Sequence, residues 1–405
     1  MPSSAQTKNK TGWLNGTVLG IGLTSLASDW SHEMATAVLP AFLISIGAGP
    51  GWLGAIEGVA DGLSSFTKLA AGHWTDRLRR RKPLVVSAYA LTALATGSLA
   101  FAANALAVML ARTTAWLGRG VRTPARKALL AAAVPPEAYG RAFGLERAMD
   151  TVGAIVAPLT ALWLLSATGH SYRRVFLWTL VPGLLAALLF GVLVRERPAS
   201  NPSKSSFAAG LRNLPPPFRW FLVAVGVFGL GDFSHTMLIL YATRTLAPQI
   251  GLAAASSVAV GLYLLHNVFY AAFAYVGGWL SDRATNRRLV LAGGYATAIA
   301  MAALLVSGAG QGAGGSHRFA LAVVFALAGI FVGVNEALED SIAASLVPQE
   351  QHGMAFGTMA AVNAVGDFGS SVLIGLLWSA YSPAAGFAAA GVLFFVGLAL
   401  LLRLK

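Results

Sequence analysis

Two pairs of an aspartate and a histidine recur in segments of the sequence that are otherwise apolar. Asp29 and His32 stand three residues apart, and Asp232 and His235 repeat this spacing in the second half of the chain. On a helix, a spacing of three places both side chains on one face. A carboxylate beside an imidazole can exchange a proton near neutral pH, or the two can bind a divalent metal ion. All four residues are therefore candidates for proton or substrate binding, and alternatively for metal binding.

Other ionisable residues also fall in apolar stretches, where a charge is costly unless it is paired or hydrated. Glu33 lies one turn beyond Asp29, and Arg119 and Glu336 lie in two further stretches. We add these three residues to the candidates for substrate or proton binding. A second group of carboxylates, most of them in i, i+4 pairs, forms secondary candidates for proton coupling. This group comprises Glu57, Asp61, Glu146, Asp150 and Asp367.

The elements that position these residues are predicted to be membrane-spanning helices. The chain has 405 residues, of which 56% are hydrophobic and 11% charged, and its mean hydropathy is +0.66. A soluble core cannot bury this much apolar surface. About twelve apolar stretches have roughly the 20 residues that a helix needs to cross the hydrocarbon. They are 14–36, 51–71, 83–103, 105–121, 143–165, 174–194, 218–240, 257–280, 289–308, 319–340, 354–380 and 384–402.

An internal repeat indicates that the chain is a duplication. Gly72–Lys82 reads GHWTDRLRRRK and Gly278–Arg288 reads GWLSDRATNRR, while Gly140–Gly144 (GRAFG) is echoed by Gly353–Gly357 (GMAFG) in the same order. We therefore expect an all-α integral membrane protein of two pseudo-symmetric six-helix bundles. The expected divisions are residues 1–196, a cytoplasmic linker over 197–217, and residues 218–405.

The placement of charge predicts the topology. The net charge is +13, and basic residues cluster near the N-terminus, in alternate loops, in the linker and at the C-terminus. The positive-inside rule therefore predicts a multi-pass protein of the plasma (inner) membrane with both termini in the cytoplasm. We expect a lipid bilayer and a small-molecule or ion substrate as partners, no nucleic acid, no cofactor, and function as a monomer. The chain has no cysteine, which excludes disulfides and thiolate metal sites.

The repeated loop resembles a signature of the major facilitator superfamily of secondary transporters. Gly72, Asp76 and Arg77 match its loop between spans 2 and 3, and Arg112 with Gly118, Gly120 and Pro124 is similar to its span-4 motif. Gly153–Pro158 resembles the antiporter motif in part. The resemblance implies transport by alternating access, with spans 1, 4, 7 and 10 lining a central cavity.

A cytoplasmic gate is predicted from two charge patterns. Asp76, Arg77 and the repeat-related Asp282 are expected to pin neighbouring helix ends through charge-assisted hydrogen bonds and helix dipoles. Arg122 and Arg126 share a face with Arg119, and we expect them to meet an acidic face across the two halves. That acidic face comprises Glu336, Glu339 and Asp340. The alternatives are that Arg119 binds an anionic group and that Arg122 and Arg126 are interfacial cations.

The function predicted from the sequence is proton-coupled transport of a small solute, with export favoured over import, and no enzymatic activity. A divalent-metal transporter that uses Asp29, His32, Asp232 and His235 is the alternative. A remote alternative is an intramembrane aspartyl protease, because Gly229–Asp232 matches the Gly-x-Gly-Asp signature of that class.

Overall fold

The computed structural model describes residues 12–403 except 49, 197, 199–204 and 310–314, and it is helical throughout its regular structure. The first half contains α1 (Gly16–Ser45), α2 (Pro50–Arg77), α3 (Lys82–Ser98), α4 (Ala105–Ala132), α5 (Tyr139–Ala167), α6 (Tyr172–Trp178) and α7 (Leu180–Leu193). A short helix, α8 (Phe207–Arg212), lies in the connecting segment. The second half contains α9 (Pro216–Gly229), α10 (His235–Ile250), α11 (Leu252–Arg283), α12 (Arg287–Val306), α13 (Gly315–Leu346), α14 (His352–Ala380) and α15 (Pro383–Arg403).

The predicted fold class is confirmed. Eight helical segments among the described residues are long and apolar enough to cross a membrane, and they include α3, α5, α11, α12, α13, α14 and α15 as well as α6 with α7. The other predicted spans correspond to α1, α2, α4 and the pair α9 and α10. Helices α1, α2 and α4 are more polar because they carry many of the ionisable residues described below. The pair α9 and α10 is interrupted.

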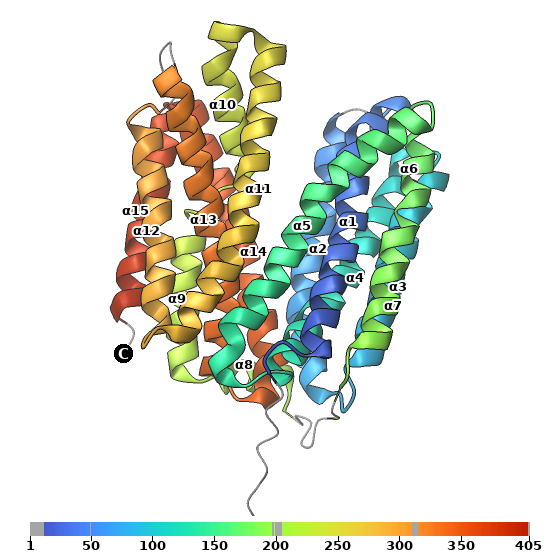
Figure 1. Cartoon of the computed structure of the whole chain (residues 1–405), viewed down its shortest axis with the longest axis vertical. Helices are drawn as coiled ribbons and strands as arrows, with labels where there is room; N and C mark the ends of the chain where they lie inside the picture. The colour runs from blue at the N-terminus through green and yellow to red at the C-terminus, as the bar shows by residue number, and fades with distance from the viewer. Residues whose placement is uncertain (1–11, 49, 197, 199–204, 310–314, 404–405) are drawn as a thin grey trace, which may run out of the picture.

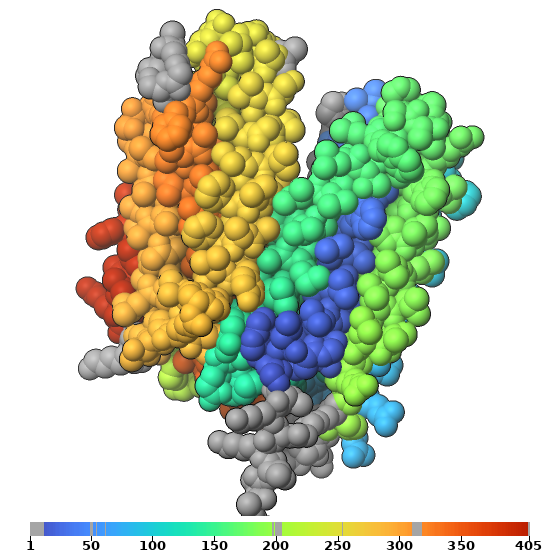
Figure 2. Space-filling view, in the orientation of Figure 1, coloured from blue at the N-terminus to red at the C-terminus, as the bar shows by residue number. Residues whose placement is uncertain are grey.

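The helices form two groups that lie side by side. Helices α1–α7 make up one group, here the N half, and α9–α15 make up the other, the C half (Figure 1). The end of the molecule where α2 is followed by α3 and α11 by α12 is here called the basic end, and the opposite end is the open end. Figure 2 shows the halves in contact toward the basic end and separated by a cleft at the open end.

The seventh predicted span is broken, which corrects one prediction from the sequence. The expected continuous helix over 218–240 consists of α9 and α10, separated by non-helical residues 230–234. Gly229 is the last residue of α9 and Gly231 lies in the break, and glycine is a poor helix former. Ser234 then caps α10 by accepting a hydrogen bond from the Thr236 backbone N–H. Asp232 lies in the break, so it does not share a helical face with His235 as predicted.

Candidate functional site

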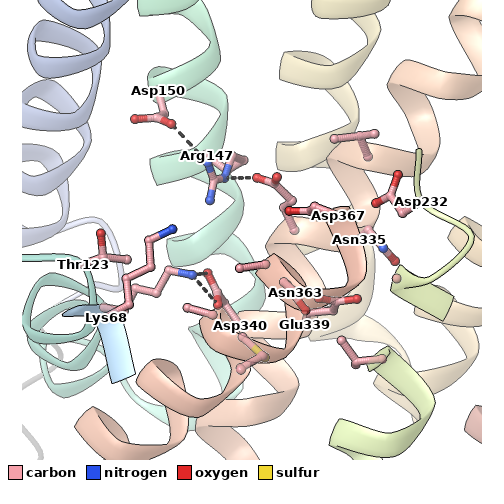
Figure 3. A pocket seen from close by; sticks show the side chains of 18 of the residues that line it. Lys68, Thr123, Arg147, Asp150, Asp232, Asn335, Glu339, Asp340, Asn363 and Asp367 are labelled. Carbon is pink, nitrogen blue, oxygen red and sulfur yellow. Dashed lines mark hydrogen bonds and ion pairs between the residues drawn. The ribbon is translucent and has the colours of Figure 1, made fainter. Parts of the chain in front are cut away.

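A polar cavity lies between the two halves. Its volume is about 320 Å³, and both halves contribute to its wall. Figure 3 shows Lys68 and Thr123 on one side and the acidic residues of the C half on the other. The N half lines it with Lys68, Trp116, Arg119, Arg122, Thr123, Arg126, Lys127, Arg147 and Asp150. The C half lines it with Val225, Phe228, Gly229, Asp232, Val332, Asn335, Glu336, Glu339, Asp340, Met359, Ala360, Asn363, Ala364 and Asp367.

The two walls differ in charge. Every cationic side chain that lines the cavity comes from the N half, whereas all the lining carboxylates except Asp150 come from the C half. Charged groups at this depth are stable only when they are paired, hydrogen-bonded or hydrated. The cavity is therefore a site for polar or charged ligands, and its walls have opposite polarity.

Three arginines follow one face of α4 and have different partners. Arg119 Nη2 lies 3.1 Å from Asp29 on α1, and Arg126 Nη1 lies 2.8 Å from Glu146 on α5. Both pairs form within the N half. Arg122 lies between the two, and in the part of the chain that the structure describes no carboxylate is within ion-pairing distance of it. The middle arginine therefore presents the least compensated positive charge of the three.

Two ion pairs join the halves across the cavity. Lys127 Nζ on α4 lies 2.7 Å from an Asp340 carboxylate oxygen on α13, and Arg147 Nε on α5 lies 2.7 Å from Glu336 Oε2 on α13. Arg147 also contacts Asp150 at 3.1 Å within its own helix. Figure 3 shows these contacts as dashed lines. The acidic face of α13 therefore helps to hold the halves in the observed arrangement.

The predicted partners of this acidic face need correction. The sequence predicted that Arg122 and Arg126 meet this acidic face across the halves, but Arg126 binds Glu146 inside the N half. Neighbouring residues on a helix point about 100° apart, so Lys127 faces Asp340 of the C half while Arg126 faces Glu146 of the N half. Lys127, through its pair with Asp340, makes the contact with the acidic face that was expected of Arg126.

We expect a charge swap to distinguish the two pairings. Lys127→Asp and Asp340→Lys should each destabilise the purified protein, because removing one partner of a buried pair costs roughly 3–5 kcal/mol. The double variant should recover much of that loss in thermal unfolding. The matched cycle with Arg126→Glu and Glu339→Arg should show no such recovery. Equal recovery in both cycles would contradict the observed pairing.

Two carboxylates of the C half lack a cationic partner among the described residues. Glu339 is 4% exposed, and its carboxylate accepts hydrogen bonds from the Asn363 amide at 3.2 Å and the Tyr295 hydroxyl at 3.3 Å. Asp232 lies in the helix break near Asp367 (Figure 3), and its backbone carbonyl accepts a hydrogen bond from Ser370. A buried carboxylate without a cationic partner is suited to bind and release a proton or to receive a cation.

The basic end is closed by two equivalent contacts. Asp76 at the end of α2 accepts hydrogen bonds from the Gly353 and Met354 backbone N–H groups, both at 2.8 Å, at the start of α14. Asp282 at the end of α11 accepts them from Gly140 at 2.8 Å and Arg141 at 2.9 Å at the start of α5. Each half thus caps a helix N-terminus of the other half, where free N–H groups and the helix dipole favour a carboxylate.

The repeated glycines permit this close approach. A Cβ atom on Gly72 would overlap the Gly353 carbonyl, and a Cβ atom on Gly278 would overlap the Gly140 carbonyl. The two repeats noted in the sequence therefore contact each other crosswise between the halves. Arg77 extends the contact differently, because it donates a 2.7 Å hydrogen bond to the Ser205 carbonyl of the linker.

The four proposed metal ligands are not brought together in this structure. His32 packs edge-on against Trp116, with ring centroids 5.0 Å apart, while His235 stacks on Tyr263 at 4.7 Å. Asp29 is bound to Arg119. Over the described residues, no group of three or more His, Asp or Glu side chains is arranged to hold a metal ion. In this conformation the structure therefore contradicts the Asp29, His32, Asp232 and His235 site.

The remaining predicted residues have local partners. Glu33 lies 4.0 Å from His32, and Glu57 binds Arg112 on α4 at 3.1 Å. The side chain of Asp61 lies outside those that the structure describes. Two important residues, Lys127 and Arg147, were absent from the candidates because each directly follows a residue that was favoured. The only signal in the sequence was that each is a charged residue directly after a candidate. Sequence alone does not fix which of two neighbouring residues faces the cavity.

Comparison with known proteins agrees with this architecture. The family model described as Major Facilitator Superfamily matches residues 18–265 and 233–405. An uncharacterised MFS-type transporter of Methanocaldococcus jannaschii is 28% identical over 90% of this chain and 89% of its own length. A multidrug resistance protein B homologue of Mycobacterium tuberculosis is 33% identical, but over only 38% of this chain and 28% of its own.

The solved structures show the same fold. The fucose:proton symporter of E. coli superposes with a TM-score of 0.76 at 18% identity, covering 96% of this chain and 98% of the symporter. At this identity the likeness concerns the fold alone. Together with the family match over nearly the whole sequence, the two helical halves and the cavity between them show that the chain belongs to the major facilitator superfamily of membrane transporters.

Proposed function

We propose that the protein is a proton-coupled exporter that exchanges protons for a small solute in the central cavity. The observation that carries the proposal is Glu339, a carboxylate that is buried beside the cavity with only neutral hydrogen-bond donors. Such a carboxyl group is stable at membrane depth in its neutral, protonated form, and it can release its proton when water reaches it. Asp232 on the same wall is the second candidate carrier.

The orientation of the protein gives the proposal its direction. We infer that the basic end faces the cytoplasm, because the basic loops gather there. The observed conformation is then outward-open, with the Asp76 and Asp282 contacts closing the cytoplasmic side. Protons would enter the cavity from outside and leave to the cytoplasm after the halves rearrange. Solute carried on the return step would move outward.

The cross-half ion pairs couple protonation to this rearrangement. Protonation of Asp340 removes the negative charge that holds Lys127 across the cavity. The outward-open state then loses part of its stabilisation relative to the inward-open state. Acidification from outside therefore favours closure of the open end, which is the direction required of a proton-driven exporter.

Two relatives support parts of the proposal without deciding it. The E. coli neighbour is named a fucose:proton symporter, and the partial relative from M. tuberculosis is named a multidrug resistance protein homologue. The first makes proton coupling reasonable on this fold, and the second favours export. The protease alternative lacks support in the described contacts, which join Asp29 to Arg119 and none of which joins it to Asp232.

Solute-induced proton movement in proteoliposomes tests the proposal. A panel of cationic, anionic and zwitterionic solutes is applied to vesicles that contain a pH-sensitive dye. A transported solute should move protons in the opposite direction, and an imposed pH gradient should drive that solute toward the acidic side. A solute flux that is independent of the gradient, or that moves with the protons, would contradict the proposal.

A further inference from the structure

The polarity of the cavity walls indicates which class of solute the site binds. Arg122 is 4% exposed and lines the cavity from the N half. Its guanidinium donates to the Ser28 hydroxyl at 2.8 Å and the Thr92 hydroxyl at 3.4 Å, and it lies 4.0 Å from the Tyr89 ring centroid. All three partners are neutral, so the charge of Arg122 is available to an anionic group in the cavity.

Two further donors on the same wall have no hydrogen-bond acceptor in the described structure. They are Arg119 Nη1 and Trp116 Nε1, both buried, and both residues line the cavity. A buried donor without an acceptor costs free energy unless a ligand or water satisfies it. The N wall therefore presents a cation and two unsatisfied donors, a combination that suits a carboxylate or a similar small anion.

The opposite wall has the complementary character. Glu339 and Asp232 carry negative charge without a described cationic partner, and Asn335, which is 6% exposed, has a buried Oδ1 without a hydrogen-bond donor. Figure 3 shows these three C-half residues near one another. An unsatisfied acceptor beside two carboxylates suits a protonated amine, which is a donor with a positive charge.

We propose that the cavity binds a small zwitterion, with its anionic group at Arg122 and its cationic amine at Asp232 and Glu339. The proposal rests on the transport function proposed above and specifies its substrate class. The volume of about 320 Å³ lies near the lower end of the ~300–1,000 Å³ typical of small-molecule sites, which limits the solute to a compact one. Occupancy of both walls gives Arg122 on one side, and Asp232 and Glu339 on the other, a partner of opposite charge at the same time. A solute with one charge leaves the other wall uncompensated.

Protonation fits the same arrangement. A proton on Glu339 or Asp232 removes the charge that holds the amine, so proton binding and amine binding compete for one wall. That competition is what exchange of solute for protons requires. The anionic group at Arg122 is unaffected by it and keeps the solute oriented.

The test uses matched probes and matched variants. The probes are a set of small amino acids, their N-acetyl derivatives, which keep only the anion, and their methyl esters, which keep only the cation. Binding is read as thermal stabilisation of the purified protein. The variants are Arg122→Gln and Asp232→Asn, with the exposed Arg80→Gln and Glu137→Gln as controls of the same charge change.

The expected result is a crossed pattern. At least one amino acid should stabilise the unmodified protein and both controls. Its two derivatives should need at least tenfold higher concentrations for the same stabilisation. Arg122→Gln should bind the methyl ester at least as well as the amino acid, and Asp232→Asn should do the same for the N-acetyl form. Stabilisation by one charge type only, irrespective of the variant, overturns the proposal. So does the absence of stabilisation by every amino acid in the set.

This outcome is separable from the proposed transport function. Binding is measured without a pH gradient, so it does not depend on proton coupling. Zwitterion binding with a flux that ignores the gradient would leave the substrate class intact and contradict the coupling. Gradient-driven flux of a singly charged solute would leave the proton coupling intact and contradict the proposed substrate class.

Discussion

Asp76→Asn is expected to reduce transport by at least about tenfold and to open the basic end of the resting protein. The Asp76 carboxylate binds two backbone N–H groups of α14, and asparagine retains only one acceptor oxygen and no charge. Charge-assisted hydrogen bonds contribute roughly 1.5–3 kcal/mol each. A loss of about 1.4 kcal/mol already shifts a conformational equilibrium tenfold.

The measurement is the labelling of a single cavity cysteine from the basic-end side. The protein has no native cysteine, so Ala360→Cys provides a unique site on the cavity wall. A membrane-impermeant maleimide should label it faster in Asp76→Asn and in the equivalent Asp282→Asn, and faster still in the double variant. Arg80→Gln, at an exposed position in the loop that follows α2, is the control. Unchanged labelling in both aspartate variants would show that the helix caps do not close this end.

Glu339→Gln is expected to abolish accumulation of solute against a gradient while preserving solute exchange. Glutamine retains the size of the side chain and an acceptor for Tyr295 and Asn363, but it cannot exchange a proton. Each coupled proton supplies about 1.4 kcal/mol per pH unit, which supports tenfold accumulation. The variant should therefore reach an accumulation ratio near one under a pH gradient of one unit.

Counterflow supplies the internal control for this prediction. Exchange of labelled for unlabelled solute needs the alternating movement but no net proton transfer, so Glu339→Gln should remain active in it. The exposed Glu137→Gln should behave like the unmodified protein in both assays. Full gradient-driven accumulation by Glu339→Gln would remove Glu339 from the proton pathway.

Much of the architecture could be predicted because the membrane imposes strong constraints on sequence. A span needs about 20 apolar residues, so composition alone indicates the number of helices. The repeat of Gly72–Lys82 at Gly278–Arg288 indicated two related halves. The role of Asp76 at a helix end followed from the interaction of a carboxylate with a helix dipole, whereas its backbone N–H partners came from the structure. Its partner helix, α14, did not follow, since contacts between halves depend on their relative placement.

The details that escaped prediction depend on small rotations and on local backbone breaks. Arg126 and Lys127 are equally basic, and only the rotation of α4 decides that Lys127 reaches Asp340. The seventh span reads as one apolar stretch, yet Gly229 and Gly231 end α9 before Asp232. Hydropathy averages over such a break, so the sequence placed Asp232 on a regular helix. The unsatisfied donors and acceptors of the cavity arise from packing and leave no pattern in the sequence.

The central claim, that protonation of the cavity drives closure of the open end, is tested most directly by distance measurements between spin labels. Ala167→Cys at the end of α5 and Ala254→Cys near the start of α11 place exposed labels on the two halves at the open end. A pair within the N half, Ala167→Cys with Leu106→Cys, serves as the control.

As the pH falls, the distance between the halves should shift toward a shorter population, because the Lys127–Asp340 link is lost on protonation. The control pair should not change, and Asp340→Asn, which removes the Lys127–Asp340 link at every pH, should reduce the response to pH. An inter-half distance distribution that stays the same from alkaline to acidic pH would contradict the account.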